Sequence, residues 1–311
     1  MKFLPILISF LLFANNTNLA LPKDNQSVNI SFAGDCTLGE FKGQGSGNQF
    51  KDYKSNGWNY YFENVQSVFA NDDLTFINLE GPLTDYPQTA VKTYPIKGDK
   101  ENINILKNSS IEVVNLSNNH IYDCGKIGFE DCVKALSENN ISFCGEGYKA
   151  TKTVSGITIT FLGYNGWSTD IKEKVIKDLA EDTSDIKIVE FHWGIEREYT
   201  HNKTQEIIAH AAVDAGADIV VGAHPHVLQD MEYYKNVPIF YSLGNFCFGA
   251  NKNPKDKDSV IVNATFTKNG IKDMKVIPCK ISSTDSKNDY KPTIVTDEGS
   301  ILRIMKKLKM Q

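Results

Sequence analysis

The chain has 311 residues, of which 41% are apolar and 23% charged, a composition typical of soluble globular proteins. The formal net charge is −5 and the lysines are scattered, which excludes the basic stripe of a nucleic-acid-binding protein. The length allows one large domain or two ordinary ones, with a substantial core in either case.

The first 20 residues predict a targeting segment. Met1 and Lys2 bring a positive charge, residues 3–14 are almost wholly apolar, and a polar stretch follows. The apolar run has the size of a signal-peptide core and is too short for an ordinary membrane span. We therefore interpret residues 1–20 as a signal peptide, with an uncleaved N-terminal anchor as the alternative. Either predicts an exported protein, in the periplasm or at the outer face of the cytoplasmic membrane.

The six cysteines show no C-x-x-C spacing, so a thiolate zinc cluster is not expected. Export would permit disulfides, and Cys124, Cys132 and Cys144 lie close enough along the chain to be candidates. We favour the alternative that most of the cysteines are small buried apolar residues.

Short apolar runs alternate with helical patterns along the chain. The runs begin at Val28, Leu74, Ile111, Ile186, Ile219 and Ile239. Helical patterns at 129–137 and 205–215 separate some of them, which predicts an α/β fold. Residues 260–281 instead predict a β-hairpin with its turn at "TKNG". A polar loop is expected over residues 282–297, and a short, solvated basic helix over residues 300–309.

Each of the six apolar runs delivers polar side chains to its carboxyl end, where sites form in open α/β folds. They are Asp35, Glu80, Asn119 with His120, His192, His224 with His226, and Asn245. Burying carboxylates and imidazoles together is costly unless a cation pairs with them. These ligand types suit one or two divalent ions of the Mn, Zn or Fe class. Two such ions, bridged by Glu80, would activate a water and hold the oxygens of a phosphoryl or acyl centre.

Five stretches carry a family resemblance: "FAGDCTLG", "INLEGPLT", "NLSNNHIYDCG", "FHWGIEREY" and "GADIVVGAHPHVLQ…YSLGNF". These stretches follow one another in the same order as in the CapA-type capsule synthesis proteins of bacteria and are spread evenly over roughly residues 28–250. The chain therefore resembles this family, which is associated with poly-γ-glutamate capsules. That family is related to the calcineurin-like metallophosphoesterases. The resemblance therefore implies a four-layer α-β-β-α sandwich in residues 27–281, followed by a polar C-terminal tail over residues 282–311.

The resemblance also implies a set of metal ligands. Asp35 and His226 would hold a first ion, and Glu80 would stand where the phosphoesterases place a bridging aspartate. A second ion would be held by Asn119, His192 and His224. The phosphoesterases usually begin with an Asp-x-His pair, whereas Cys36 and Thr37 follow Asp35 here, so the first ion lacks one ligand. Cys36 is expected in the core, because neighbouring residues of a strand face opposite sides.

Four further residues receive roles from the resemblance. His120 would donate a proton to the leaving group, and Asp123 would orient its imidazole. Glu196 and Asn245 would line the substrate site.

The implied function is the synthesis, export or processing of an anionic capsule polymer by metal-assisted hydrolysis or transfer. The expected partners are the polymer or its precursor and membrane-bound capsule synthase subunits, with no nucleic acid. Two alternatives stay open. One is a non-catalytic polymer- or metal-binding subunit of a capsule assembly complex, and the other is a metal-dependent phosphoesterase acting on a small substrate.

Overall fold

The computed structural model describes residues 26–41 and 43–310. The expected signal peptide lies outside these residues. Within them, none of the helices combines the length and the hydropathy needed to span a bilayer.

The larger sheet, called sheet 1, is built around β1 (Val28–Thr37). Its other strands are β3 (Leu74–Leu79), β5 (Val113–Asn115), β6 (Ser142–Cys144), β13 (Asn245–Phe248), β14 (Asp258–Thr267), β15 (Gly270–Lys280) and β16 (Thr293–Ile294). The strand order is β16-β15-β14-β1-β3-β5-β6, and β13 pairs with the end of β1. The strands β1, β3, β5, β6 and β13 run parallel, whereas β14 and β15 form the predicted antiparallel hairpin.

The second sheet, called sheet 2, has six strands. They are β7 (Ala150–Val154), β8 (Ile157–Gly166), β9 (Ile186–Trp193), β10 (Ile219–Ala223), β11 (Met231–Tyr234) and β12 (Val237–Phe240). The order is β11-β12-β10-β9-β8-β7, with β8, β9, β10 and β12 parallel. A separate ribbon pairs β2 (Glu40–Phe41) with β4 (Ile96–Lys97).

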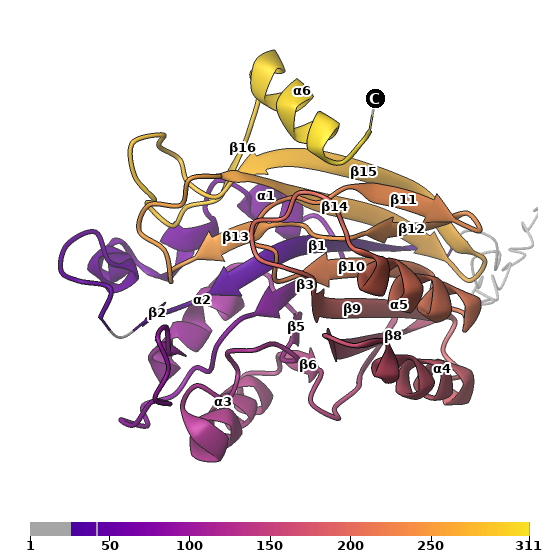
Figure 1. Ribbon diagram of the computed structural model, residues 1–311, viewed down its shortest axis with the longest axis horizontal. Coiled ribbons are helices and arrows are strands. Elements are labelled where there is room, and N and C mark those ends of the chain that lie inside the picture. Colours follow the sequence, from indigo (N-terminus) through magenta and orange to yellow (C-terminus); the bar gives the residue numbers. More distant parts are fainter. Residues whose placement is uncertain (1–25, 42, 311) are drawn as a thin grey trace, which may run out of the picture.

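Helices cover the outer faces of both sheets (Figure 1). The α-helices are α1 (Gln66–Phe69), α2 (Ile103–Asn108), α3 (Gly125–Glu138), α4 (Lys172–Glu181), α5 (Lys203–Asp214) and α6 (Glu298–Lys307). Short 3-10 helices are η2 (Phe50–Asn56), η3 (Trp58–Phe62), η4 (Lys100–Asn102) and η5 (Thr169–Ile171).

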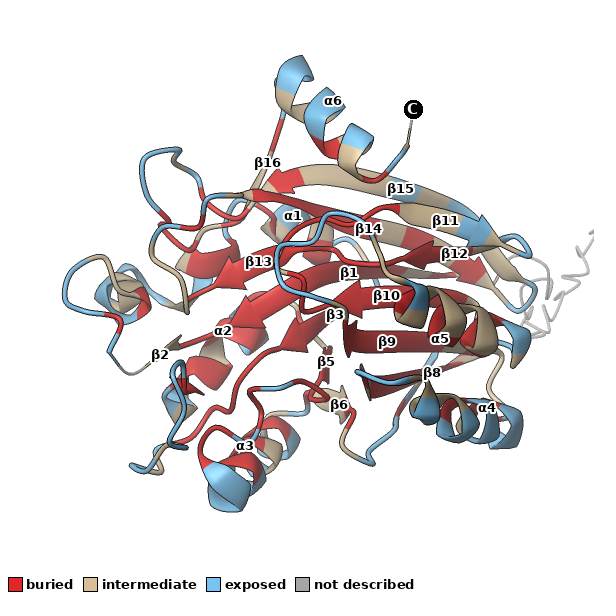
Figure 2. Ribbon diagram, viewed as in Figure 1, coloured by how far each residue is buried: buried red, intermediate tan, exposed pale blue. Residues whose placement is uncertain are grey.

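Three buried clusters define four layers. Phe69, Leu106 and Leu136 join α1, α2 and α3 to sheet 1, and the cluster between the two sheets contains Phe32 and Phe161. A third cluster packs α4 and α5 against sheet 2. The central strands β1, β3, β9 and β10 are accordingly almost wholly buried, whereas β7, β11, β15 and the outer sides of the helices are partly exposed (Figure 2). This arrangement confirms the predicted α-β-β-α sandwich.

All six predicted strands are present, and so are the two predicted helices, α3 and α5. The six cysteines are buried and free, which confirms the favoured interpretation, and Cys36 lies in the core between sheet 1 and its helices. The strand β8 and the helix α4 were not predicted.

The C-terminal helix α6 forms where a short basic helix was expected, but it is not a solvated terminus. Ile304 and Leu308 are buried in the core between the sheets. Their spacing of four residues places both on one face of the helix, and burial of that face holds the helix against β14 and β15.

Candidate metal centre

The predicted ligands gather where the carboxyl ends of the two sheets meet. The arrowheads of β1, β9 and β10 point to the same side in Figure 1. A direct hydrogen bond joins the sheets there, because the backbone N–H of His224 donates to Asp35 Oδ2 over 3.1 Å. Sequence segments almost two hundred residues apart therefore build one site.

Asp35 is a wholly buried carboxylate surrounded by donors. Its Oδ1 accepts a hydrogen bond from Asn78 Nδ2 at 2.7 Å, and its Oδ2 lies 3.2 Å from His226 Nδ1. Burial favours the neutral acid, but the hydrogen bond and charge of His226, supported by His192 and Asn78, lower the pKa of Asp35 to about 2. Asp35 is thus held in the ionised form that binds cations.

Glu80 is wholly buried, and neither of its carboxyl oxygens has a hydrogen-bond partner among the described residues. Oε1 lies 3.7 Å from His226 Nε2 and 3.8 Å from His120 Nε2. Burial raises the pKa of Glu80 well above its usual range. An orphaned buried carboxyl is expensive, and a cation between it and the imidazoles would remove that cost.

Two groups of side chains could each hold a metal ion. Single ligand atoms of Asp35, Glu80 and His226 lie within 4.8 Å of one another, and so do those of Glu196, His224 and His226. The first group matches the predicted first ion and its bridging carboxylate. The second shares only His224 with the predicted second ion. It contains Glu196, which was expected to line the substrate site, and His226, which was assigned to the first ion, instead of Asn119 and His192.

The two histidines of the His-Pro-His segment differ in charge. Burial disfavours the protonated form of His226, but its contacts with the buried carboxyls of Glu80 and Asp35 outweigh this and raise its pKa above the usual range. Burial lowers the pKa of His224 to about 4, and its Nδ1 is buried without a partner among the described residues. His224 is therefore neutral at pH 7, which is the form that coordinates metals.

His192 and Asn119, two predicted ligands of the second ion, contact each other directly. His192 Nε2 lies 2.9 Å from Asn119 Oδ1, and His192 Nδ1 lies 3.3 Å from Asn78 Nδ2. Because the Asn78 amide nitrogen can only donate, Nδ1 accepts and Nε2 carries the hydrogen that Asn119 Oδ1 receives. The ring centroids of His192 and His224 lie 4.8 Å apart, so His192 lies beside another predicted ligand of the second ion.

His120 and Asp123 form the expected pair. His120 Nδ1 lies 2.7 Å from Asp123 Oδ2, which leaves Nε2 turned toward Glu80. Asn245 lies on the other side of the site, where its Oδ1 is 3.0 Å from His226 Nδ1 and its Nδ2 donates to the His226 carbonyl. All ten predicted residues therefore lie at one edge of the two sheets, although their individual roles stay predictions.

Thr37 stands where the phosphoesterases usually have a histidine. Its Oγ1 accepts a hydrogen bond from the backbone N–H of Ala250 at 2.9 Å, so the side chain has a structural partner. The chain therefore offers the first ion Asp35, Glu80 and His226 without a fourth side chain from β1.

The backbone of the His-Pro-His segment is left-handed at both histidines. The φ angles are 96° at His224 and 58° at His226, and residues other than glycine rarely adopt such positive values. Such strain is retained where surrounding contacts over-determine it, commonly at functional sites. Here the left-handed backbone directs the imidazoles of His224 and His226, which belong to one short segment, toward the same site.

Solved structures share this fold. A novel phosphatase from Mycoplasma pneumoniae is 13% identical with a TM-score of 0.53, over 89% of this chain and 97% of that one. A hypothetical protein from Thermus thermophilus is 15% identical with a TM-score of 0.53, over 81% and 99%. Together with the layer order, they show the calcineurin-like metallophosphoesterase sandwich.

The sequence decides the family. The family model described as "Bacterial capsule synthesis protein PGA_cap" matches residues 29–250. The chain belongs to this capsule synthesis family. The "Capsule biosynthesis protein CapA" of Bacillus anthracis is 31% identical over 85% of this chain and 70% of its own length. The "PGA biosynthesis protein CapA" of Bacillus subtilis (strain 168) is 32% identical over 82% and 72%.

Two further residues of this capsule synthesis family member contact the site without having been predicted. Asn78 donates to Asp35 and contacts His192, and a polar residue inside the apolar run "FINLE" was the available signal. Trp167 follows β8, and its ring lies edge-on to His224 at 4.7 Å between centroids. It escaped notice because β8 itself was missed.

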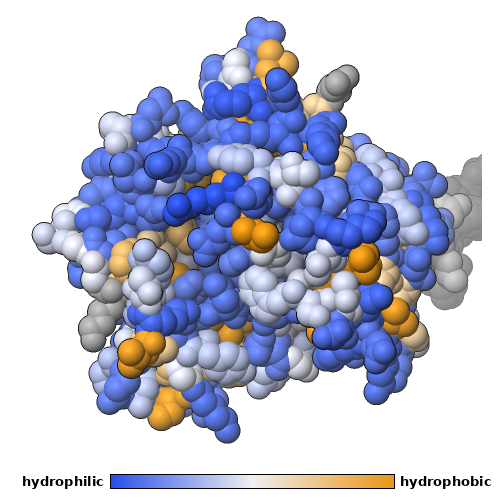
Figure 3. Space-filling view, in the orientation of Figure 1, coloured by the Kyte–Doolittle hydropathy of each residue, from blue (hydrophilic) through white to orange (hydrophobic). Residues whose placement is uncertain are grey.

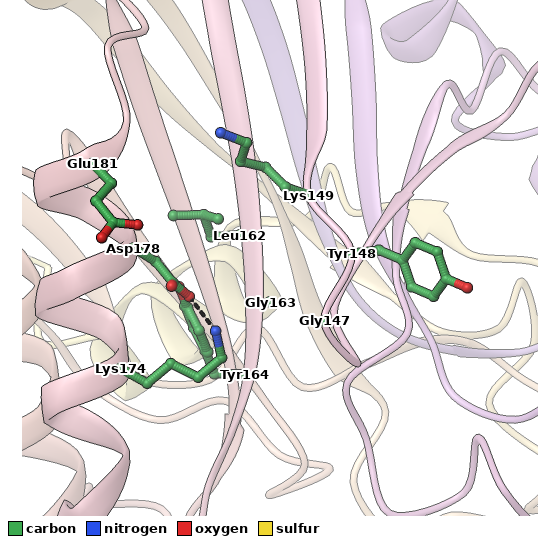
Figure 4. Close-up of a pocket in the computed structure, with 9 residues that line it drawn as sticks. All are labelled: Gly147, Tyr148, Lys149, Leu162, Gly163, Tyr164, Lys174, Asp178 and Glu181. Carbon is green, nitrogen blue, oxygen red and sulfur yellow. Dashed lines mark hydrogen bonds and ion pairs between the residues drawn. The ribbon is translucent and has the colours of Figure 1, made fainter.

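A cleft of about 220 Å³ lies outside the metal centre, beside α4 (Figure 4). Lys174 Nζ pairs with Asp178 Oδ2 at 2.6 Å, and Lys149, on the opposite wall, pairs with Asp182 at 2.7 Å. Both lysines of the cleft are already paired with carboxylates, so an incoming anion would have to compete with Asp178 and Asp182 for them. The face shown in Figure 3 is mostly hydrophilic, with hydrophobic residues in isolated groups rather than a continuous patch.

Proposed function

We propose that this protein is exported and acts on an anionic capsule polymer, poly-γ-glutamate or its precursor, by metal-assisted hydrolysis or transfer. The observation that carries the proposal is Glu80, a buried carboxyl that lies between two imidazoles and has no hydrogen-bond partner among the described residues. The relatives named for capsule and PGA biosynthesis support the choice of polymer. The apolar run of residues 3–14 supports export.

The donor set fits a divalent ion of the Mn, Zn or Fe class. Asp35, Glu80 and His226 would hold one ion, and Glu196 and His224 would contribute to a second one. Asn119 and His192 would join the second ion after giving up their mutual hydrogen bond. When bound, the metal supplies Lewis-acid polarisation and a water of lowered pKa.

The protein's own residues supply the proton chemistry. Asp123 accepts the hydrogen of His120 Nδ1 and so aims Nε2 into the site. A protonated His120 would then deliver its Nε2 hydrogen to the leaving oxygen or nitrogen. Trp167, 48% exposed, forms T-shaped contacts with the rings of His192 and His224 and would shield that side of the site from bulk water.

The test of this proposal is a metal and activity measurement on the purified protein. Wild type, His120→Ala and the control His210→Ala are assayed for bound metal and for hydrolysis of phosphoesters and γ-glutamyl amides. His210 is a suitable control because it pairs with Glu232 on the surface of sheet 2, away from the predicted ligands. Loss of the general acid should lower kcat by about 10²–10⁴-fold while the metal content stays unchanged. Metal-free wild type without turnover would rule the proposal out.

A second candidate function is a non-catalytic subunit of a capsule assembly complex, in contact with membrane-bound synthase subunits. Thr37 favours it, because the first ion would lack the histidine that the phosphoesterases usually supply at this position, and a weakly held or missing ion would leave the site without its proposed chemistry. Capsule yield in a strain carrying His120→Ala separates the two. An enzyme loses polymer or alters its length, whereas a subunit of this kind keeps normal output and co-purifies with the synthase. Release of phosphate from small substrates in the first assay would instead support the small-substrate phosphoesterase.

A further inference from the structure

A surface loop of residues 85–95, called the 85–95 loop, connects the end of β3 with β4. Its base is closed by two backbone hydrogen bonds, from Thr84 N to Gly98 O at 2.9 Å and from Gly98 N to Pro82 O at 3.0 Å. Most of the loop is exposed, and Val91 at its tip is fully so. Exposed loops of this kind usually have little reason to contact a site beneath them.

This loop and the strand after it nevertheless converge on one buried residue, Asp123. The backbone N–H of Ala90 donates to the Asp123 carbonyl at 2.6 Å, and that of Ile96 donates to Asp123 Oδ2 at 2.6 Å. The ammonium of Lys92 lies 2.5 Å from Asp123 Oδ1. Because His120 Nδ1 also contacts Oδ2, both oxygens of this carboxylate have charged or polar partners.

Lys92 makes a second contact at the site. Its Nζ donates to the carbonyl oxygen of Asn119 at 3.1 Å. One ammonium therefore joins the carboxylate that orients His120 to the backbone of a predicted metal ligand. The side chain of Lys92 is one-third exposed, whereas that of Asp123 is almost wholly buried.

We infer that Lys92 is a positioning residue, which fixes the His120–Asp123 pair and the Asn119 backbone in one geometry. A carboxylate held at both oxygens cannot rotate, so it presents the same oxygen to His120 Nδ1 and keeps the hydrogen there. Without the ammonium, Oδ1 loses its charged partner and the carboxylate gains freedom to turn. The catalytic consequence rests on the proposed function, but the effect on the His120 imidazole does not.

The experiment compares Lys92→Met, Lys92→Arg and Lys97→Met with wild type. Lys97 is the matched control, because its Nζ donates to the Tyr86 carbonyl at 2.7 Å and thus stabilises the same loop without touching Asp123 or Asn119. The first readout is the ¹⁵N shifts of the His120 imidazole in the metal-free protein, which report the tautomer. The second is steady-state kinetics with Mn²⁺ on the substrate found in the first assay.

We expect the hydrogen of His120 to stay on Nδ1 in wild type, Lys92→Arg and Lys97→Met, and to distribute over both nitrogens in Lys92→Met. In Lys92→Met, kcat should fall by about 10- to 100-fold, the usual effect of losing a residue that orients a ligand, with KM nearly unchanged. Lys92→Arg should restore most of this loss.

Two results would overturn the inference: unchanged His120 shifts in Lys92→Met, or an equal loss in Lys97→Met. If wild type shows no turnover on any substrate, the proposed hydrolysis fails while the tautomer comparison still decides the role of Lys92. Should Lys92→Met not fold, Lys92→Gln replaces it with the same readouts.

Discussion

Glu80 is not the only carboxyl of this protein whose pKa is raised by burial. Asp72 lies just before β3, away from the predicted ligands, and Thr75 Oγ1 donates to its Oδ2 at 2.9 Å. Burial raises the pKa of Asp72 to about 7, hydrogen bonds from Ser31 and Thr75 offset part of this rise, and the charges of Glu112 and Asp73 add to it. At this residue, ionisation and folding therefore oppose each other.

The pH dependence of stability follows from the sign of that shift. A folded-state pKa above the ordinary 3.8 means that the stabilisation is fully present below pH 3.8 and is lost as the pH rises through about 7. Asp72→Asn removes the charge and keeps an oxygen for Thr75. We expect the variant to unfold at a higher temperature than wild type at pH 8 and at nearly the same temperature at pH 4. Thermal unfolding at pH 4, 6 and 8 measures this, and parallel curves for the two proteins would contradict it.

At the scale of elements, the start of α5 links the helix layer to the metal centre. Asn202 Oδ1 accepts from Gln205 N at 3.0 Å, and Gln205 Oε1 accepts from Asn202 N at 3.0 Å, so the two residues form a capping box. Gln205 Nε2 also donates to Gln229 Oε1, and Gln229 Nε2 donates to the Glu198 carbonyl. The cap therefore supports the loop that carries Glu196.

Removal of this cap should destabilise the fold. Asn202→Ala is expected to lower the free energy of unfolding by about 1 kcal/mol, because the first turn of α5 loses its side-chain acceptor. Urea denaturation measures the change. The control is Lys203→Ala, which removes only an exposed ion pair with Glu206 and should leave the unfolding midpoint within error. Equal midpoints for Asn202→Ala and wild type would show that the cap is dispensable.

The elements that carry site residues were predictable because their patterns are local. The run Ile186–Phe191 is apolar, has the length of a strand and ends at His192, so its position and its site residue could be read together. The strand β8 was harder because glycine interrupts it. Gly163 is required there, since a Cβ at this position would lie 2.0 Å from Asn115 Oδ1.

The contacts between elements could not be predicted from local patterns. Lys92 and Asp123 are separated by 31 positions, and Lys92 lies in a loop whose sequence has no periodic pattern of apolar residues. Trp167, which follows β8, contacts His224, which follows β10. The hydrogen bond between Asn119 and His192 likewise depends on how the two sheets pack. The sequence therefore predicted the His120–Asp123 pair and the other candidate site residues, but not the contacts that Asn78, Trp167 and Lys92 make with them.

At the scale of the whole molecule, the predicted metal centre joins the two sheets. Asp35 and Glu80 come from strands of sheet 1, whereas His224 and His226 follow β10 of sheet 2. A bound ion would be coordinated from both sides of the core between the sheets. Its binding energy would therefore add to the stability of the complete fold rather than to one layer.

The whole-molecule prediction is a metal-dependent unfolding temperature. Mn²⁺ at one hundred times its Kd should stabilise the native state by about 2.7 kcal/mol, and EDTA should reverse the effect. His226→Ala should abolish the response, because His226 belongs to both ligand groups, while His210→Ala should retain it. Differential scanning fluorimetry with a Mn²⁺ titration measures the shift. If the unfolding temperature of the wild type changes with neither Mn²⁺ nor EDTA, the ligand assignment is wrong.

The spread of the ligands along the chain has a consequence for biogenesis. Asp35 and Glu80 come from the first strands to be synthesised, but His224 and His226 join them only after β10 and the segment behind it have been made. Neither of the two possible ligand groups is therefore complete until His226 has been synthesised and the two sheets have packed together. If the protein is exported and binds a metal as proposed, the free-metal pool of the compartment in which it folds would determine which ion it acquires.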